Sequence, residues 1–288
     1  MKFVVLFFLF FFSHLYAFEY TLSSSKVANA QTLFIKFQTQ SDEKLIKVAV
    51  GKRVYSIFKL KSGEFYSYIP FSYYEKVGLK DIKVVYEKNH KKLHRLLKVE
   101  IVEGNYKKEH ITVSKSKVNP KSKTVKKRTS KEYKEAMDIY GSVTQKSYVS
   151  SAYILPMHSK ITSAFGTARV YNNELKGYHS GTDFRAKVGT PIYASNDGVV
   201  VLAKDRFYAG GSVLVDHGEG IYSCYYHMSK FDVKEGDKVK KNQKLGLSGK
   251  SGRVTGPHLH FSMRVGGLQV DPLQFIELVN REKYKEKR

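Results

Sequence analysis

The chain has 288 residues, which is long enough for two domains of ordinary size. Its 50 lysines and arginines outnumber its 26 aspartates and glutamates, and the resulting formal charge of +24 indicates an anionic partner. The single cysteine, Cys224, excludes an internal disulfide, and its place in a strand-like run favours a small buried side chain over a nucleophile.

The first 17 residues have the pattern of a secretory signal peptide. Met1-Lys2 precedes an apolar run from Phe3 to Phe12, and Ala17 supplies a small residue for cleavage. The run is shorter than the roughly 20 residues of a membrane-spanning helix, with retention as an anchor the alternative. No cysteine directly follows the run, which excludes lipid attachment there. Export argues against nucleic acid and favours wall peptides, which carry carboxylates, or an anionic membrane surface as the partner.

Residues 18–113 are predicted to form a small β-sandwich. Apolar and polar residues alternate in short runs such as Leu33 to Phe37 and Leu97 to Val102, and glycines separate the runs. No metal-binding or catalytic pattern occurs there. Two roles stay open for this accessory domain: it positions the rest of the chain or covers a groove in it, or it packs without taking part in chemistry.

Residues 114–152 are predicted to connect two domains. Ser114 to Lys131 is dense in lysine, serine and threonine and contains Pro120, which is typical of an exposed basic linker. Glu132 to Gly141 is predicted to be a short helix that ends at the glycine. Its candidate inner face, at helical spacing, consists of Tyr133, Ala136, Met137 and Tyr140.

Residues 153–275 are predicted to form a second domain with an antiparallel β-sheet and a groove built from loops, where functional sites concentrate. Strand-like segments are separated by glycine, asparagine and aspartate. They are Pro191 to Ala194, Gly198 to Ala203, Ser212 to Val215 and Ile221 to His227. Residues 276–288 are predicted to be a charged tail with a short, fraying helix.

Two motifs in this second domain supply candidate metal ligands. His179 and Asp183 lie in His-Ser-Gly-Thr-Asp, and His258 and His260 lie in His-Leu-His. The second motif begins an alternating run after a Gly-Pro breaker, so both imidazoles are expected on one face of a strand. Two imidazoles and a carboxylate suit a divalent metal that keeps one position for water, and the spare histidines, including His227, suit proton transfer. The pattern therefore indicates a hydrolase.

Taken one at a time, these residues would more simply be interpreted as structural. A single histidine is usually a surface or structural side chain, and a single aspartate is usually a turn or cap residue. Only the joint occurrence of the two motifs favours a site. The histidines without such context are His14, His90, His94, His110, His158 and His217, the last in a predicted hairpin turn.

From Ile154 to Pro272 the chain resembles the lysostaphin-like (LytM-type) zinc metallopeptidases. The motifs occur in the same order as in that family: Ile161 to Gly166, His179 to Asp183, Gly189 to Ala194, Tyr226-His227, Val233 to Gly246 and Thr255 to Phe261. The resemblance implies one zinc ion per chain, held by His179, Asp183 and His260.

The same resemblance makes His258 and His227 the catalytic pair. Which of them acts as the base is left open, although the position of His258 beside a metal ligand favours it. Asn172 matches a loop position at the family's substrate groove. Tyr226 is predicted to lie beside the metal and to contact substrate.

The family cuts peptide cross-links of bacterial peptidoglycan, so the resemblance implies an exported D,D-endopeptidase of the periplasm or cell envelope, acting between D-alanine and meso-diaminopimelate in cell-wall remodelling. A D,D-carboxypeptidase is the close variant. The alternatives are an inactive regulator of wall hydrolases, a wall-binding protein with incidental histidines, and a biotinyl or lipoyl carrier suggested by Val233 to Gly246. A regulator would lose metal ligands, and a carrier would show a modifiable lysine. The oligomeric state is not predicted.

Overall fold

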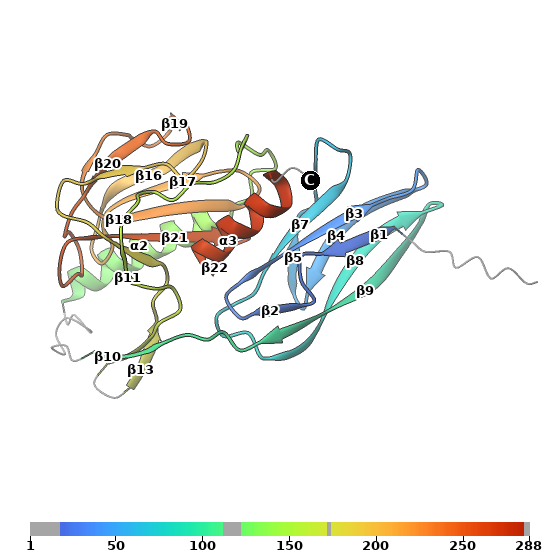
Figure 1. Cartoon of the computed structure of the whole chain (residues 1–288), viewed down its shortest axis with the longest axis horizontal. Helices are drawn as coiled ribbons and strands as arrows, with labels where there is room; N and C mark the ends of the chain where they lie inside the picture. Colours follow the sequence, from blue (N-terminus) through green and yellow to red (C-terminus); the bar gives the residue numbers. More distant parts are fainter. Residues whose placement is uncertain (1–17, 112–121, 172–173, 285–288) are drawn as a thin grey trace, which may run out of the picture.

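The computed structural model describes residues 18–111, 122–171 and 174–284. Figure 1 shows two β-rich units side by side, and the predicted mainly β fold with antiparallel sheets is confirmed. The predicted signal peptide at residues 1–17, residues 112–121 of the predicted linker, and Asn172 lie outside the described residues. Within the described ranges, no helix is long and apolar enough to cross a membrane.

The N-terminal unit is a sandwich of two sheets. One sheet has the strand order β1-β3-β7-β6 and the other has the order β2-β9-β8-β4-β5. Alternate side chains of each strand point inward, so Phe37 and Ile69 from one sheet meet Val84 and Leu97 from the other in a buried cluster. The strands are β1 (Glu19–Leu22), β2 (Lys26–Ala28), β3 (Thr32–Gln38), β4 (Glu43–Val50), β5 (Arg53–Tyr55), β6 (Phe58–Lys59), β7 (Phe65–Pro70), β8 (Gly78–Lys88) and β9 (Lys91–Val102).

Helix α2 (Lys123–Gly141) begins well before the predicted start at Glu132. Residues 123–131, predicted to be linker, are therefore helical, although they are mostly exposed as predicted. Ser122 caps the helix by accepting a hydrogen bond from the backbone N–H of Val125. Long lysine and arginine side chains lose little rotamer freedom in a helix, which explains why this basic stretch is helical. In the sequence, the high lysine content of this stretch suggested a linker and not a helix.

The C-terminal unit is built on one large antiparallel sheet with the order β11-β14-β21-β18-β17-β16-β19. The four predicted strand segments correspond to β15, β16, β17 and β18, of which β18 runs four residues further than predicted, to Phe231. The strands are β11 (Ile161–Ser163), β14 (Thr182–Arg185), β15 (Pro191–Tyr193), β16 (Gly198–Arg206), β17 (Gly210–Asp216), β18 (Ile221–Phe231), β19 (Lys238–Val239), β20 (Lys244–Ser248), β21 (His258–Val265) and β22 (Leu268–Val270).

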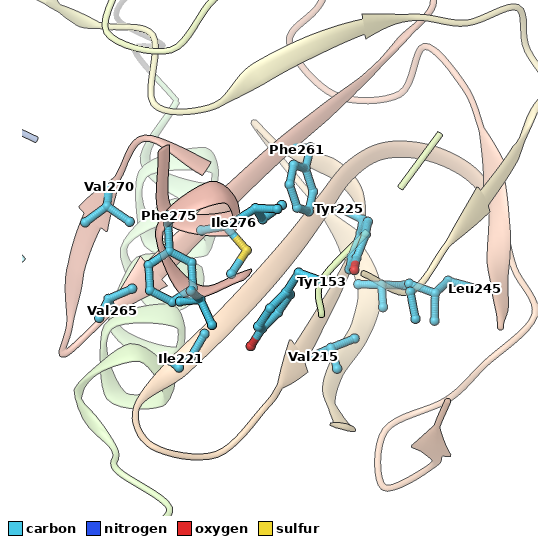
Figure 2. Packing of buried hydrophobic residues seen from close by; sticks show 14 of the residues in the cluster. Tyr153, Val215, Ile221, Tyr225, Leu245, Phe261, Val265, Val270, Phe275 and Ile276 are labelled. Carbon is cyan, nitrogen blue, oxygen red and sulfur yellow. The ribbon is translucent and has the colours of Figure 1, made fainter. Parts of the chain in front are cut away.

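The two faces of this sheet have different tasks. On one face, Phe261 and Val265 of β21 and Tyr225 of β18 join the main buried core, shown in Figure 2. On the other face, Ala136 and Tyr140 of α2 pack over Leu202, Leu214, Tyr222 and Cys224. Because side chains alternate along β21, His258, His260 and Arg264 all lie on this second face.

The C-terminal segment is not the predicted charged tail. Helix α3 (Pro272–Val279) starts at the cap residue Asp271 and buries Phe275, Leu278 and Val279, so it belongs to the core. It is followed by one π-helical turn, η1 (Asn280–Tyr284). The charged residues that suggested a solvated tail are confined to the residues after α3 and to Glu277, while the helix itself is apolar on its inner side.

The two units share one core. Phe34, Tyr66 and Tyr68 of the N-terminal sandwich belong to the same buried cluster as Phe275 of α3, and Figure 1 shows α3 beside β7. Gln274 of α3 makes two hydrogen bonds with the backbone of Thr32, each 3.0 Å long. The chain leaving the sandwich forms β10 (Lys108–Ile111), which pairs in parallel with β12 (Ala168–Tyr171), itself paired with β13 (Glu174–Tyr178).

Candidate metal centre and catalytic site

Strand pairing brings the two predicted motifs to one place on the large sheet. In the register between β14 and β21, Asp183 lies directly opposite His260. In the register between β18 and β21, Tyr226 lies opposite His260 on its other side. His179 precedes β14 in the loop after β13 and reaches the same face. A loop and a strand therefore bring His179 and Asp183 together.

The three predicted ligand side chains meet in a compact cluster. The Oδ1 atom of Asp183 is 3.0 Å from Nε2 of His179 and 2.8 Å from Nδ1 of His260. The two imidazole nitrogens are 3.0 Å from each other. In a tetrahedral zinc site with bonds of ~2.0–2.1 Å, ligand atoms lie ~3.3 Å apart. The observed spacing is slightly tighter than that and places the three donors around a common point.

Neighbouring groups determine which nitrogen of His179 carries the proton and leave space for the His260 ring. Nδ1 of His179 donates to the carbonyl of Ala164 at 2.8 Å, which leaves Nε2 with its lone pair towards Asp183. A Cβ atom at Gly181 would lie 2.6 Å from Nε2 of His260, so any larger residue at this position would clash with the His260 ring. Burial by itself raises the pKa of Asp183, but the neighbouring imidazoles of His179 and His260 outweigh it and hold the pKa well below the ordinary value.

The donor set fits a zinc ion. An ionised carboxylate and two imidazoles with available lone pairs are the ligands that catalytic zinc sites use, and three protein ligands leave a position for water. The cluster is nearly buried, with His179 1% and Asp183 8% exposed. Among the described residues, these three are the group of histidines, cysteines and carboxylates close enough to hold a metal, with ligand atoms within 4.8 Å of one another.

His258 and His227 lie next to the cluster. Their rings are 4.9 Å apart, and Nε2 of His258 is 3.7 Å from Oδ1 of Asp183. Each ring is held through Nδ1 by a backbone carbonyl, that of Gly256 for His258 and that of Ser251 for His227, both at 2.9 Å. In the neutral form of each ring, Nδ1 carries the proton and Nε2 carries the free lone pair.

A β-bulge places His227. Gly211 pairs with Met228 and Val213 pairs with Tyr225, so Ser212 alone stands opposite two residues, Tyr226 and His227. His227 takes a φ of 61°, outside the usual range of a strand. The bulge turns the His227 side chain towards His258. Without the bulge, the alternation of side chains along β18 would place His227 on the opposite face of the sheet. Burial, and then the neighbouring His260 and His258, lower the pKa of His227 to about 3.

Tyr226 lies beside the cluster of candidate metal ligands, and its hydroxyl has a hydrogen-bond partner inside the protein. The Tyr226 ring is 5.5 Å from the His260 ring, and its hydroxyl is 2.9 Å from the hydroxyl of Tyr140 on α2. The contact between Tyr226 and substrate stays a prediction. Nothing in the motifs pointed to Tyr140, or to the carbonyls of Ala164 and Ser251, because backbone groups and distant partners leave no mark on local sequence.

His217, predicted to be a turn residue, starts the turn between β17 and β18 but is completely buried. Its Nδ1 donates to the carbonyl of Asp197 at 2.7 Å, and its Nε2 is 2.7 Å from the hydroxyl of Ser223. Both nitrogens are thus engaged, and burial lowers the pKa of His217 to about 4. It belongs to the core and not to the site.

Comparison with known proteins agrees with this geometry. Residues 177–272 match the model of peptidase family M23. The peptidoglycan DD-endopeptidase ShyA of Vibrio cholerae is 44% identical over 122 residues, which are 41% of this chain and 28% of ShyA. The chain thus covers less than a third of that relative's length.

Two solved structures extend the comparison. A putative peptidase M23 from Pseudomonas aeruginosa has a TM-score of 0.63 and 26% identity, over 80% of this chain and 87% of that one. The catalytic domain of lysostaphin from Staphylococcus simulans is 32% identical over 41% of this chain and 92% of that one, with a TM-score of 0.37. The matched segment, residues 177–272, contains the whole histidine and aspartate cluster, and this part of the chain is similar to peptidase family M23.

Proposed function

We propose that the protein is an exported zinc-dependent peptidoglycan hydrolase that cuts peptide cross-links between D-alanine and meso-diaminopimelate. The observation that carries the proposal is the convergence of His179, Asp183 and His260, with His227 and His258 beside them. An inactive regulator of the same fold would be expected to lack part of this set. The similarity to an endopeptidase that acts on peptidoglycan supports the choice of substrate.

In the proposed mechanism, His179, Asp183 and His260 hold the zinc ion of the family, which when bound supplies a Lewis acid and lowers the pKa of water to about 7. His258 and His227 both offer Nε2 as an acceptor, so each can take one hydrogen bond from the attacking water. His258, the nearer to the cluster, takes the proton and returns it to the leaving amine. The imidazolium formed in between faces the developing oxyanion and stabilises it.

The charge of the protein supports an envelope location. A formal charge of +24 favours contact with carboxylate-bearing stem peptides or with an anionic membrane surface. We therefore place the enzyme in the periplasm or cell envelope. Activity as a D,D-carboxypeptidase, which releases a terminal D-alanine, requires the same zinc site and differs only in how the substrate's end is accommodated.

Digestion of purified muropeptides, read by mass spectrometry, tests the proposal. We expect cross-linked dimers to fall to monomers, and loss of D-alanine from pentapeptide monomers would identify the carboxypeptidase variant. A chelator and the substitution Asp183→Ala should each abolish the reaction, and added zinc should restore only the chelated wild type. His158→Ala, at an exposed histidine, is the matched control. Intact dimers after incubation with zinc-loaded protein would favour the inactive regulator.

A further inference from the structure

Helix α2 lies outside the matched segment, residues 177–272, yet contacts Tyr226, which lies beside the candidate ligand His260. It covers the same sheet face that carries His260, so the helix and the site are neighbours on one surface. The last buried residue of the helix is Tyr140, whose side chain is 3% exposed. Two separate chains of contacts lead from Tyr140 to the candidate zinc ligands.

The first chain runs through Tyr226. The hydroxyls of Tyr140 and Tyr226 are 2.9 Å apart, and the Tyr226 ring packs 5.5 Å from the ring of His260. Tyr226 and His260 are also direct neighbours in the strand register. The hydroxyl pair therefore fixes the ring that limits how far His260 can turn away from Asp183.

The second chain runs through Arg264. Its guanidinium lies over the Tyr140 ring, 4.2 Å from the centroid, and donates to Oε1 of Gln269 at 3.3 Å. Gln269 in turn donates to the carbonyl of Ser180, the residue next to His179. One aromatic ring on α2 is thus connected to the loop of the first ligand and to the strand of the third.

The helix is held firmly enough to serve as a support. Glu132 accepts a hydrogen bond from the backbone of Phe207, and Arg206 donates to the backbone carbonyl of Glu132, both at 2.9 Å. Arg128 bonds Asp205 at 3.0 Å. These contacts attach α2 to the end of β16 and to the turn that follows it, so movement of α2 relative to the sheet is restricted.

We propose that Tyr140 is a positioning residue of the zinc site, and that α2 preorganises His260 through Tyr226 and the His179 loop through Arg264 and Gln269. The inference rests on the proposed zinc-dependent function. Partners one step beyond a metal's ligands orient those ligands, and their removal typically weakens metal binding ~10- to 100-fold. Tyr140 is further from the ligands than such partners, so we expect zinc binding to weaken by a factor near the lower end of this range.

The test is the zinc dissociation constant of the full chain, measured by competition with a chromophoric chelator. Tyr140→Phe and Tyr226→Phe remove the two ends of one hydrogen bond, and we expect each to weaken zinc binding about tenfold. Because they break the same contact, the double variant should be no weaker than either single one. Tyr133→Phe is the matched control, since Tyr133 lies on the same helix with its side chain 65% exposed.

The unfolding temperature of the zinc-free variants separates positioning from packing. If zinc affinities equal that of the wild type while zinc-free Tyr140→Phe and Tyr226→Phe melt earlier, α2 only packs and the inference is overturned. Additive losses in the double variant would also overturn it. Wild-type protein that binds no zinc would instead defeat the proposed function itself, so the two failures are distinguishable. Should one variant not fold, the other tests the same bond.

Discussion

The three candidate ligands and the neighbouring histidine pair lie on the same face of the large sheet but are held in different ways. Asp183, His179 and His260 contact one another at 2.8–3.0 Å, and each limits the position of the others. His258 and His227 are each held by a backbone carbonyl at Nδ1. Side chains that bind a metal need a fixed arrangement, whereas side chains that move protons need one free nitrogen.

The largest expected effect would separate these two groups. His258→Ala and His227→Ala should each lower turnover of cross-linked muropeptide dimers roughly 10²- to 10⁴-fold, the usual contribution of a positioned acid or base. Zinc content should stay at one ion per chain, because neither residue belongs to the ligand cluster. Turnover by mass spectrometry and zinc by elemental analysis on the same samples check both statements.

The comparison with Asp183→Ala sharpens this result, since that variant should lose zinc and turnover together. Loss of zinc from His258→Ala or His227→Ala would show that the two groups act as one, contrary to the separation of roles. If only one of the two variants loses activity, that histidine is the base, which decides the question that the sequence left open.

His217 offers a second comparison, with a smaller expected effect, between the proposed catalytic histidines and a buried structural one. Both of its nitrogens are engaged by Asp197 and Ser223, and burial holds its pKa at about 4 in the folded protein, against an ordinary value of 6.5. Between these values the unfolded chain binds a proton that the folded one does not. The free energy of unfolding should therefore fall as the pH drops from 6.5 to 4, by up to about 3 kcal/mol.

Urea unfolding of zinc-free protein at pH 7 and pH 4.5 measures this loss without a contribution from metal binding. In His217→Gln the pH dependence should be smaller, because the titrating group is gone, although the variant should be less stable at pH 7. His158→Gln is the exposed control. An unchanged pH dependence in His217→Gln would mean that other groups cause the acid sensitivity.

The sequence was informative where chemistry and strand alternation coincide. The convergence of His179, Asp183 and His260 could be predicted because these residues lie in short motifs, and because side chains alternate along β21. That the three bind zinc stays a proposal. The sequence failed where partners are distant in the chain: the predicted start of α2 was too late, and α3 was predicted to be part of a charged tail. His217 does lie in the predicted turn, but its burial was not foreseen. In each case the deciding contact, such as Arg128 with Asp205 or Gln274 with Thr32, joins residues far apart in sequence.

The described part of the accessory domain, residues 18–111, contacts residues next to His179, and this contact offers the test with the smallest expected effect. The ring of Tyr73 stacks on Tyr178 at 3.8 Å, immediately before His179. The Tyr73 hydroxyl donates to the carbonyl of Gly166, whose N–H donates to the carbonyl of His179. These contacts favour a positioning role for the domain over a role in covering the groove.

We expect Tyr73→Ala to cost about 1 kcal/mol of interaction between the domain and the His179 loop, seen as zinc affinity weakened several-fold. Tyr73→Phe keeps the stack and loses only the hydrogen bond, so its effect on zinc affinity should be smaller. Turnover at saturating zinc should stay near the wild-type value in both variants, because His258 and His227 are untouched. A marked rise in turnover in Tyr73→Ala would indicate instead that the domain obstructs the groove, since loosening its hold would then admit substrate more readily.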